Sequence, residues 1–323
     1  MSAPAATASP RGRPAPGAGI EGRYLLDREG VLGPLMLLPV VVYIVALVGF
    51  PFVLAILYSF SDVNVGDQSL DLIGWDNFRA IWQNGTFRTA LGNTFLFTFA
   101  SQILVLILAN VLALVLSADF HGKRLVRFLI LLPWTTPIAL GVIGWLWLLH
   151  PIYSPIDATL RMVGLLGPDT LFGPGRNVQW LAKADTARLS VLLVHVWRTL
   201  PLATTILLAG LSAIPQDVKD AANIDGASFW RQVWYIRIPL LLPIMAVAVL
   251  YGMVFTFTDM TVVYILTAGG PTDSTQVLAS YAFYKGISGG DLAQGAAIAL
   301  FLFPALVGVA VLMLRMARRT ETS

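Results

Sequence analysis

Six long apolar stretches constrain the fold of this chain more than any other feature of its sequence. Each reaches the ~20 residues that an α-helix needs to cross the hydrocarbon core of a bilayer. Only 12% of all residues are charged, about half the ~25% of a typical soluble domain. The sequence therefore predicts an all-α membrane protein with about six transmembrane helices, at residues 35–60, 94–117, 128–149, 189–211, 240–266 and 293–314.

The placement of lysine and arginine predicts the orientation, because these residues are enriched in short cytoplasmic segments. The two tails and the second and fourth connections carry thirteen of the 21 basic residues. The other three connections carry seven, although together they are longer. We therefore expect both termini to lie in the cytoplasm.

The same pattern divides the chain. Residues 1–34 are rich in Ala, Pro, Gly and Arg, and are predicted to form a disordered cytoplasmic tail. Residues 35–315 form the predicted transmembrane domain, and 316–323 a second cytoplasmic tail. The external segments, 61–93, 150–188 and 267–292, contain Pro, Gly and Trp, and are expected to form short helices and turns.

The connection between the fourth and fifth stretches is the most informative segment. Pro215 suits the first turn of a helix that continues to Ala222, and Gly226 then allows a sharp bend. A second amphipathic helix follows and leads to Pro239. From helix periodicity alone, this loop could either bind a partner or simply join two spans.

This loop, residues 215–239, resembles the EAA loop of binding-protein-dependent ABC importer permeases. Its matching positions are Asp220, Ala221, Ala222, Asp225, Gly226 and the closing Ile236-x-x-Pro239. Asp220 stands where that family usually has Glu, and Ile238 where it usually has Leu. The resemblance implies the type I ABC importer permease fold. It also implies that residues 220–222, Asp225 and Gly226 couple the chain to a separate ATPase subunit.

Other motifs resemble the carbohydrate-uptake branch, in particular the maltose-permease-like and glycerol-phosphate-permease-like first subunit. They are Trp197 to Pro201, similar to W-x-x-x-P; Leu266 to Pro271, similar to LT-x-GGP; and residues 155–181, similar to the second external loop. The resemblance implies an ATP-driven importer in the cell membrane. Its solute would be a disaccharide, another sugar, a sugar alcohol or a glycerol phosphate.

The resemblance also implies the partners. They are the lipid bilayer, a homologous second permease, a dimer of ATPase subunits and an extracellular solute-binding protein, with no nucleic acid. The sequence has no G-x-x-x-x-G-K-[ST] phosphate loop. We therefore expect a transport subunit that is not an enzyme and holds no cofactor, with ATP and Mg²⁺ bound to the partner ATPase.

Ionisable residues inside a membrane span cost ~2.5–3.5 kcal/mol at the helix centre, so they tend to face a cavity or a partner. Such residues occur in two stretches. Aligning the family motifs places two stripes where maltose-type permeases contact sugar, and these are the predicted solute residues: His195, Arg198, Thr199 and Leu202 in the fourth stretch, and Gly252, Phe255, Thr256 and Asp259 in the fifth. Asp259 would either bind solute directly or pair with Arg198 as a structural ion pair.

The sequence is also compared with two other function classes, a secondary transporter and an intramembrane enzyme. An ion- or proton-coupled secondary transporter could use Asp259 and His195, but the EAA-like loop would then have no role. An intramembrane enzyme is disfavoured, because no Ser/His/Asp set or metal-ligand spacing occurs within the stretches. A metal site is not expected either, since the chain has no cysteine and its three histidines lie in different segments.

Overall fold

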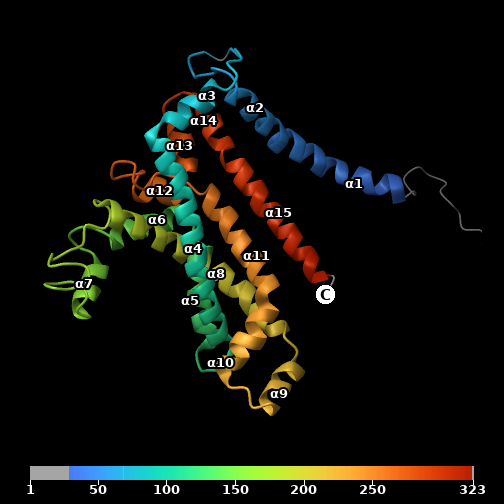
Figure 1. The fold of residues 1–323 in the computed structure, drawn as a ribbon, viewed down its shortest axis with the longest axis vertical. Helices are drawn as coiled ribbons and strands as arrows, with labels where there is room; N and C mark the ends of the chain where they lie inside the picture. Colours follow the sequence, from blue (N-terminus) through green and yellow to red (C-terminus); the bar gives the residue numbers. More distant parts are fainter. Residues whose placement is uncertain (1–28, 68, 322–323) are drawn as a thin grey trace, which may run out of the picture. The chain divides into compact units, whose positions relative to one another are not determined.

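The computed structural model describes residues 29–67 and 69–321. They form helices joined by turns and loops (Figure 1), with one isolated antiparallel bridge between Ser61 and Leu72 and no strand among them. Five of their helices are long and apolar enough to cross a membrane, and a bent helix pair supplies a sixth if it counts as one span. The chain forms two compact units, of which one ends at Leu54 and the other begins at Ala55.

The first unit consists of helix α1 (Glu29–Ile44), a π-helical turn η2 (Val45–Gly49) and the start of α2 (Phe50–Ser59). Its apolar side chains are exposed, Met36 by 71% and Tyr43 by 64%, as expected of a helix that lipid or another subunit surrounds. Because α1 begins at Glu29, residues 29–34 are helical and do not belong to the expected disordered tail. The rest of that tail, residues 1–28, lies outside the described residues.

The second unit is built around three long helices, α4 (Gly85–Ser117), α8 (Ala184–Ala213) and α11 (Ile238–Thr258). Helices α4 and α8 lie side by side, and α11 packs against both and against α15 (Leu302–Glu321) (Figure 1). Small residues let these helices approach closely: a Cβ at Gly210 would lie 2.7 Å from the Ile244 side chain.

The third expected span, residues 128–149, is not one straight helix. It consists of α5 (Lys123–Thr135) and α6 (Ile138–Leu148), which are bent by 103°. Thr136 between them is extended, with φ −77° and ψ 134°. This is the conformation expected of a residue before proline, here Pro137.

The fifth expected span, residues 240–266, differs at both ends. After the short helix α9 (Gln216–Ile224), helix α10 (Phe229–Gln232), the π-helical turn η3 (Val233–Arg237) and α11 form one continuous apolar rod. Pro239 does not interrupt this rod. It lies just after the π-helical turn η3, where the α-helical hydrogen-bond pattern is already changed. The rod ends at Thr258, and α12 (Thr261–Leu266) is a separate helix.

The sixth span runs from Leu292 to Leu312 through α14 (Leu292–Leu300) and α15. Helix α15 then continues to Glu321, past the expected end of the transmembrane domain at residue 315. Short helices are present in all three segments that are predicted to be external. They are α3 (Asp76–Gln83), α7 (Pro155–Met162) and α13 (Leu278–Phe283), which the π-helical turn η4 (Tyr284–Ser288) extends.

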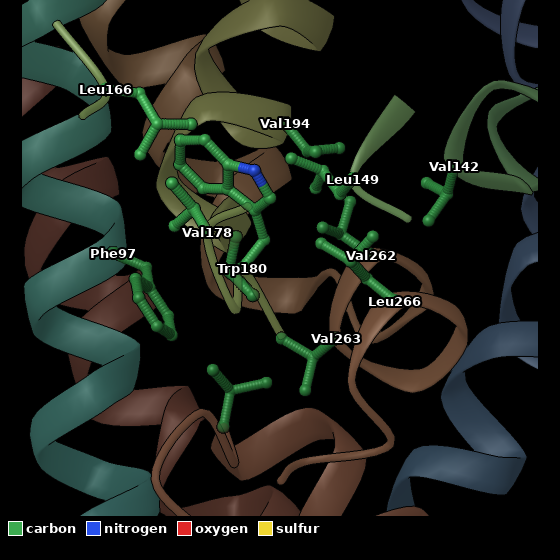
Figure 2. Close-up of a cluster of buried hydrophobic side chains, with 12 residues drawn as sticks. Phe97, Val142, Leu149, Leu166, Val178, Trp180, Val194, Val262, Val263 and Leu266 are labelled. Carbon is green, nitrogen blue, oxygen red and sulfur yellow. The ribbon is translucent and has the colours of Figure 1, made fainter. Parts of the chain in front are cut away.

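A buried cluster around Trp180 holds the segment between α6 and α8 against α8 and α12. Figure 2 shows Trp180 beside Leu166 and Val194. The carboxylate of Asp157, which is fully buried, accepts hydrogen bonds from Trp180 Nε1 at 2.8 Å and from the Val178 backbone N–H at 3.0 Å. These bonds tie the start of α7 to Val178 and Trp180 near the end of the same segment.

Candidate functional site

Four predicted solute residues lie on α8, near its internal Pro201. His195 and Thr199 are buried, and the Thr199 hydroxyl donates to the His195 carbonyl at 2.8 Å. Arg198 and Leu202 are half-buried. One helical turn separates each of the pairs His195–Thr199 and Arg198–Leu202, so these four side chains share one side of α8.

Three predicted residues lie on α11, on the side that packs against α4 and α8. Gly252 and Thr256 are buried, and the Thr256 hydroxyl donates to the Gly252 carbonyl at 2.9 Å. The ring of Phe255 packs on Tyr251, with 4.5 Å between ring centroids, and on Trp134 of α5, with 5.7 Å. These aromatic rings and the small Gly252 line the same space between the helices.

A small cavity is lined by residues of both α8 and α11. It lies among α4, α5, α8 and α11, and its free volume is about 10 Å³, roughly enough for one water molecule. The structure therefore brings four predicted residues into one site, but in a closed form. The lining residues are Gln102, Val105, Trp134, Thr199, Leu202, Ala203, Ala248, Tyr251, Gly252 and Phe255.

Gln102 of α4 is the most polar group on this lining. Its side chain is buried, and its Nε2 lies 3.3 Å from both Thr256 Oγ1 and Ser101 Oγ. Its Oε1 is buried and has no hydrogen-bond partner within the described residues. An unpaired buried acceptor costs about 1–3 kcal/mol, so this oxygen is a strong candidate for binding a hydroxyl donor.

Asp259 lies outside the cavity lining, at the break between α11 and α12. Its Oδ2 is 3.0 Å from Arg198 Nη1 and 3.8 Å from His195 Nδ1. Its carboxylate also accepts from the Thr261 backbone N–H at 3.1 Å and lies 3.5 Å from that of Val262. The side chain is 5% exposed. The carboxylate thus caps α12 and neutralises a buried cation at the same time.

Arg198 connects this ion pair to the cavity. Its guanidinium carbon lies 5.8 Å from the centre of the Phe255 ring, within the range of a cation–π contact. Its side chain is 17% exposed, more than those of His195 and Asp259. Arg198 is therefore the most exposed of the three residues in this ion-pair group.

The loop between α8 and α11 folds as two short helices with a sharp turn, as predicted. Gly226 has φ +68°, in the left-handed region. The Gly226 N–H donates to the Asn223 carbonyl at 3.1 Å, and the Ala227 N–H to the Ala222 carbonyl at 2.9 Å. These two bonds form a Schellman motif, in which glycine is the favoured residue.

The predicted coupling residues surround this turn. Asp220, Ala221, Asp225 and Gly226 are exposed, whereas Ala222 is buried against the loop itself. Asp220 accepts a hydrogen bond from Gln216 Nε2 at 3.0 Å. In Figure 1 the loop, α9 and α10, forms the end of the second unit opposite to α3 and α14. An exposed, rigid turn at one end of a helix bundle can serve as a docking element.

Comparison with known proteins identifies the family. Residues 106–322 match the family of binding-protein-dependent transport system inner membrane components. The chain is also 31% identical over 288 residues to a probable ABC transporter permease of Brucella suis, covering 89% of this chain and 97% of the relative. The chain belongs to this permease family. Membership confirms a multi-pass inner-membrane protein with the non-catalytic role of a transport component.

Two further matches describe the permease. It is 29% identical over 292 residues to the trehalose/maltose transport system permease protein of Thermococcus litoralis, covering 90% of this chain and 95% of the relative. Its fold matches that of a chain of a bacterial alginate ABC transporter, with a TM-score of 0.74, 20% identity and coverage of 91% and 96%. This likeness confirms the type I ABC permease fold. The secondary-transporter alternative gains no support from either match.

Sequence reasoning missed two polar residues of this permease. Gln102 carries no charge, so a search for ionisable groups in the spans passes over it; a search for any amide in an apolar run would have found it. Gln232 of α10 donates to Asn223 Oδ1 at 2.8 Å and to the Ala227 carbonyl at 3.0 Å. It fixes the angle between α9 and α10, and the amphipathic pattern of the loop gave no sign of this.

Gly252→Ala is expected to destabilise the permease, because a Cβ there would lie 2.6 Å from Gln102 Cδ. Overpacking of this kind costs about 1–3 kcal/mol. The measurement is the thermal unfolding midpoint in detergent. The second substitution Gln102→Ala should restore the midpoint, and Gly144→Ala, where no atom lies within 4 Å, should leave it unchanged or raised. An unchanged midpoint for Gly252→Ala alone would contradict this packing.

Proposed function

We propose that this permease forms part of the translocation path for a sugar or sugar-like solute in an ATP-driven importer. The observation that carries the proposal is the cavity among α4, α5, α8 and α11. Its lining combines aromatic rings with Gln102, whose side-chain oxygen has no hydrogen-bond partner within the described residues. Sugars present apolar C–H faces to aromatic rings and hydroxyl donors to polar acceptors. Trp134, Tyr251 and Phe255 supply the rings, and Gln102 and Thr199 supply the polar groups.

The names of the relatives support this solute class. The Thermococcus relative is named for trehalose and maltose, and the alginate transporter carries a polysaccharide. Trehalose, maltose and alginate are all carbohydrates. We therefore propose that the solute of this permease is a disaccharide, another sugar, a sugar alcohol or a glycerol phosphate. The residues proposed to line its path are His195, Arg198, Thr199, Leu202, Gly252, Phe255 and Thr256.

Asp259 has a different role in this proposal. Its carboxylate oxygens are occupied by Arg198 and by the first backbone N–H groups of α12. We assign to Asp259 the role of a positioning residue, which holds Arg198 at the edge of the path. The solute would then meet the guanidinium and not the carboxylate.

The closed cavity fits an alternating-access cycle. A free volume of about 10 Å³ cannot hold a sugar, so α8 and α11 have to separate before the solute binds. The coupling loop joins these same two helices, through Ile214 at the end of α8 and Arg237 before α11. Movement of the loop by a partner would therefore act directly on the helices that line the path.

The partners in this proposal are a second, homologous permease, two ATPase subunits and an extracellular solute-binding protein. The ATPase would bind ATP and Mg²⁺ and would dock on Asp220, Ala221, Ala222, Asp225 and Gly226. The permease itself would carry no cofactor. The exposed side chain of Ile224, at 86% exposure beside this turn, adds an apolar contact for a docking cleft.

Reconstitution tests the proposal. The permease would be co-expressed with the proposed ATPase, second permease and binding protein, and placed in proteoliposomes with a panel of labelled sugars. We expect uptake of one solute class, dependent on ATP and on the binding protein. Uptake by the permease alone, driven by an ion gradient, would overturn the proposal in favour of a secondary transporter.

The proposed orientation makes a separate prediction. An alkaline phosphatase fused after Gly167 should be active, because this enzyme folds only outside the cytoplasm, and fusions after Gly122 or at Ser323 should be inactive. Green fluorescent protein at the same positions serves as the reciprocal control, fluorescent only on the cytoplasmic side. The opposite pattern would reverse the orientation drawn from the lysine and arginine residues.

A further inference from the structure

A second cavity, separate from the solute path, lies where α4 and α8 end. Its volume is about 300 Å³, and it is enclosed between these helix ends and the coupling loop. Four of its lining residues are large and apolar, two are small, and two are cationic. They are Leu114, Leu211, Ile214 and Phe229; Ser117 and Ala118; and Lys219 and Arg237. The lining contains no acidic residue.

Arg237 has unused hydrogen-bonding capacity in this cavity. Its Nε is buried and has no hydrogen-bond partner within the described residues, and its Nη2 makes only a long contact, 3.4 Å, with Gln232 Oε1. The guanidinium carbon lies 5.5 Å from the centre of the Phe229 ring. A buried donor without a partner is rare in native proteins and calls for a ligand or an ordered water.

Lys219 adds a second unpaired cation. It is half-buried on α9, and no hydrogen bond or ion pair joins its side-chain ammonium to another residue that the structure describes. The neighbouring Asp220 carboxylate is bonded to Gln216 instead. A third basic residue, Arg127 of α5, contacts the Leu116 carbonyl at 3.4 Å, beside the same end of α4. A half-closed space with this charge and no counter-charge selects an anion.

The position of the cavity identifies the kind of anion. The apolar spans of α4 and α8 end at Ser117 and Ala213, so the cavity lies at the level of a membrane surface, where lipid phosphates are found. Val111 and Val115, in the last two turns of α4, are exposed by 53% and 50%. Trp230 and Trp234 on the loop are also exposed, by 66% and 62%, and tryptophan is enriched at this depth.

We propose that this cavity binds the phosphate group of an anionic phospholipid. The phosphate would accept hydrogen bonds from the Nε edge of Arg237 in the bidentate geometry that arginine favours, and from Lys219 Nζ. The apolar wall formed by Leu114 and Leu211 would receive the first part of an acyl chain. Basic pockets between membrane helices at the cytoplasmic surface bind lipid headgroups in this manner.

A lipid in this place would join the coupling loop to the ends of α4 and α8. Lys219 belongs to α9, Arg237 lies directly before α11, and Leu114 and Leu211 belong to the bundle. One lipid molecule, through its headgroup and its acyl chain, would therefore contact both the coupling loop and the ends of α4 and α8. Coupling between ATP hydrolysis and transport should depend on anionic lipid.

Lipid retention by the complete transporter tests the proposal. The complex would be assembled in nanodiscs of phosphatidylcholine with or without phosphatidylglycerol, extracted, and analysed by native mass spectrometry. We expect wild-type complex to retain phosphatidylglycerol over phosphatidylcholine, and the Lys219→Gln/Arg237→Gln variant to lose at least ~10-fold of that preference, equivalent to ~1.4 kcal/mol. Arg231→Gln, which removes an exposed charge from the same loop, should retain the wild-type preference.

Several outcomes would overturn the lipid site. Equal retention of the two lipids by the wild type would show that the cavity does not select anionic lipid and would assign it to a partner side chain. An unchanged lipid preference in the double variant would show that Lys219 and Arg237 do not bind the lipid. Binding of inorganic phosphate in phosphatidylcholine nanodiscs, dependent on Arg237 but without lipid retention, would assign a soluble phosphate instead. If the double variant fails to assemble, Arg237→Lys should still retain more lipid than Arg237→Gln, and equal retention would count against the proposal.

Discussion

Replacing Gly226 with proline is expected to abolish solute-stimulated ATP hydrolysis and transport by the assembled importer. Gly226 has φ +68°, and its N–H donates to the Asn223 carbonyl. Proline fixes φ near −65° and has no N–H, a combination that costs about 3 kcal/mol or more where the backbone is constrained. The turn between α9 and α10 would open, and the surface proposed to dock on the ATPase would lose its shape.

The matched control is Gly226→Asn. Asparagine tolerates the left-handed region better than other non-glycine residues, and no side-chain or backbone atom lies within 4 Å of a Cβ at this position. This variant should therefore keep most of the coupled activity. Both variants should reach the membrane in similar amounts, because the turn lies outside the bundle. Normal stimulated hydrolysis in the proline variant would show that the loop does not transmit ATPase movement.

The sequence was sufficient to predict the helical class, the approximate spans and the turn at Gly226. These predictions rest on strong local signals. An apolar run of 20 residues has few stable alternatives to a membrane helix, and a glycine after a short helix is the usual end of a Schellman motif. The orientation across the membrane stays a prediction, because a fold alone does not fix which end faces the cytoplasm.

The breaks within the spans were not predicted, because hydropathy records how apolar a segment is and not its direction. Residues 128–149 are apolar throughout, yet the chain turns by 103° at Thr136 and Pro137. Pro239 and Pro243, by contrast, stay inside a continuous rod. Proline alone therefore does not decide the outcome. Pro137 follows an extended residue, whereas Pro239 lies just after a π-helical turn, where the α-helical hydrogen-bond pattern is already changed.

The site was predicted in part, for a related reason. Helical spacing placed Thr199, Leu202, Gly252 and Phe255 on two faces, and the structure brings these faces together. The same spacing also placed Asp259 on the second face, which assumes that the helix continues past Thr258. Because α11 ends at Thr258, the carboxylate turns instead toward Arg198 and the start of α12. Gln102 comes from a third helix, and pairing between helices is not encoded in a local pattern.

Asp259→Asn is expected to destabilise the permease strongly. The substitution keeps the size of the side chain and part of its capping of α12, but it leaves the largely buried guanidinium of Arg198, now 3.0 Å from Asp259 Oδ2, without a counter-charge. Removing one partner of a buried ion pair costs about 3–5 kcal/mol. The readouts are the yield of assembled complex and its thermal unfolding midpoint. Asp185→Asn, which removes an exposed carboxylate from the first turn of α8, should change neither.

The double substitution Arg198→Gln with Asp259→Asn separates structure from transport. With both charges removed, no buried charge is left without a counter-charge. Assembly and the unfolding midpoint should therefore return most of the way from the values of Asp259→Asn to those of the wild type. If Arg198 contacts the solute and Asp259 only positions it, the recovered complex should still transport poorly, because the guanidinium is absent. Recovery of transport together with assembly would make both residues a structural pair. Full stability of Asp259→Asn alone, with altered solute specificity, would instead show that the carboxylate itself binds the solute.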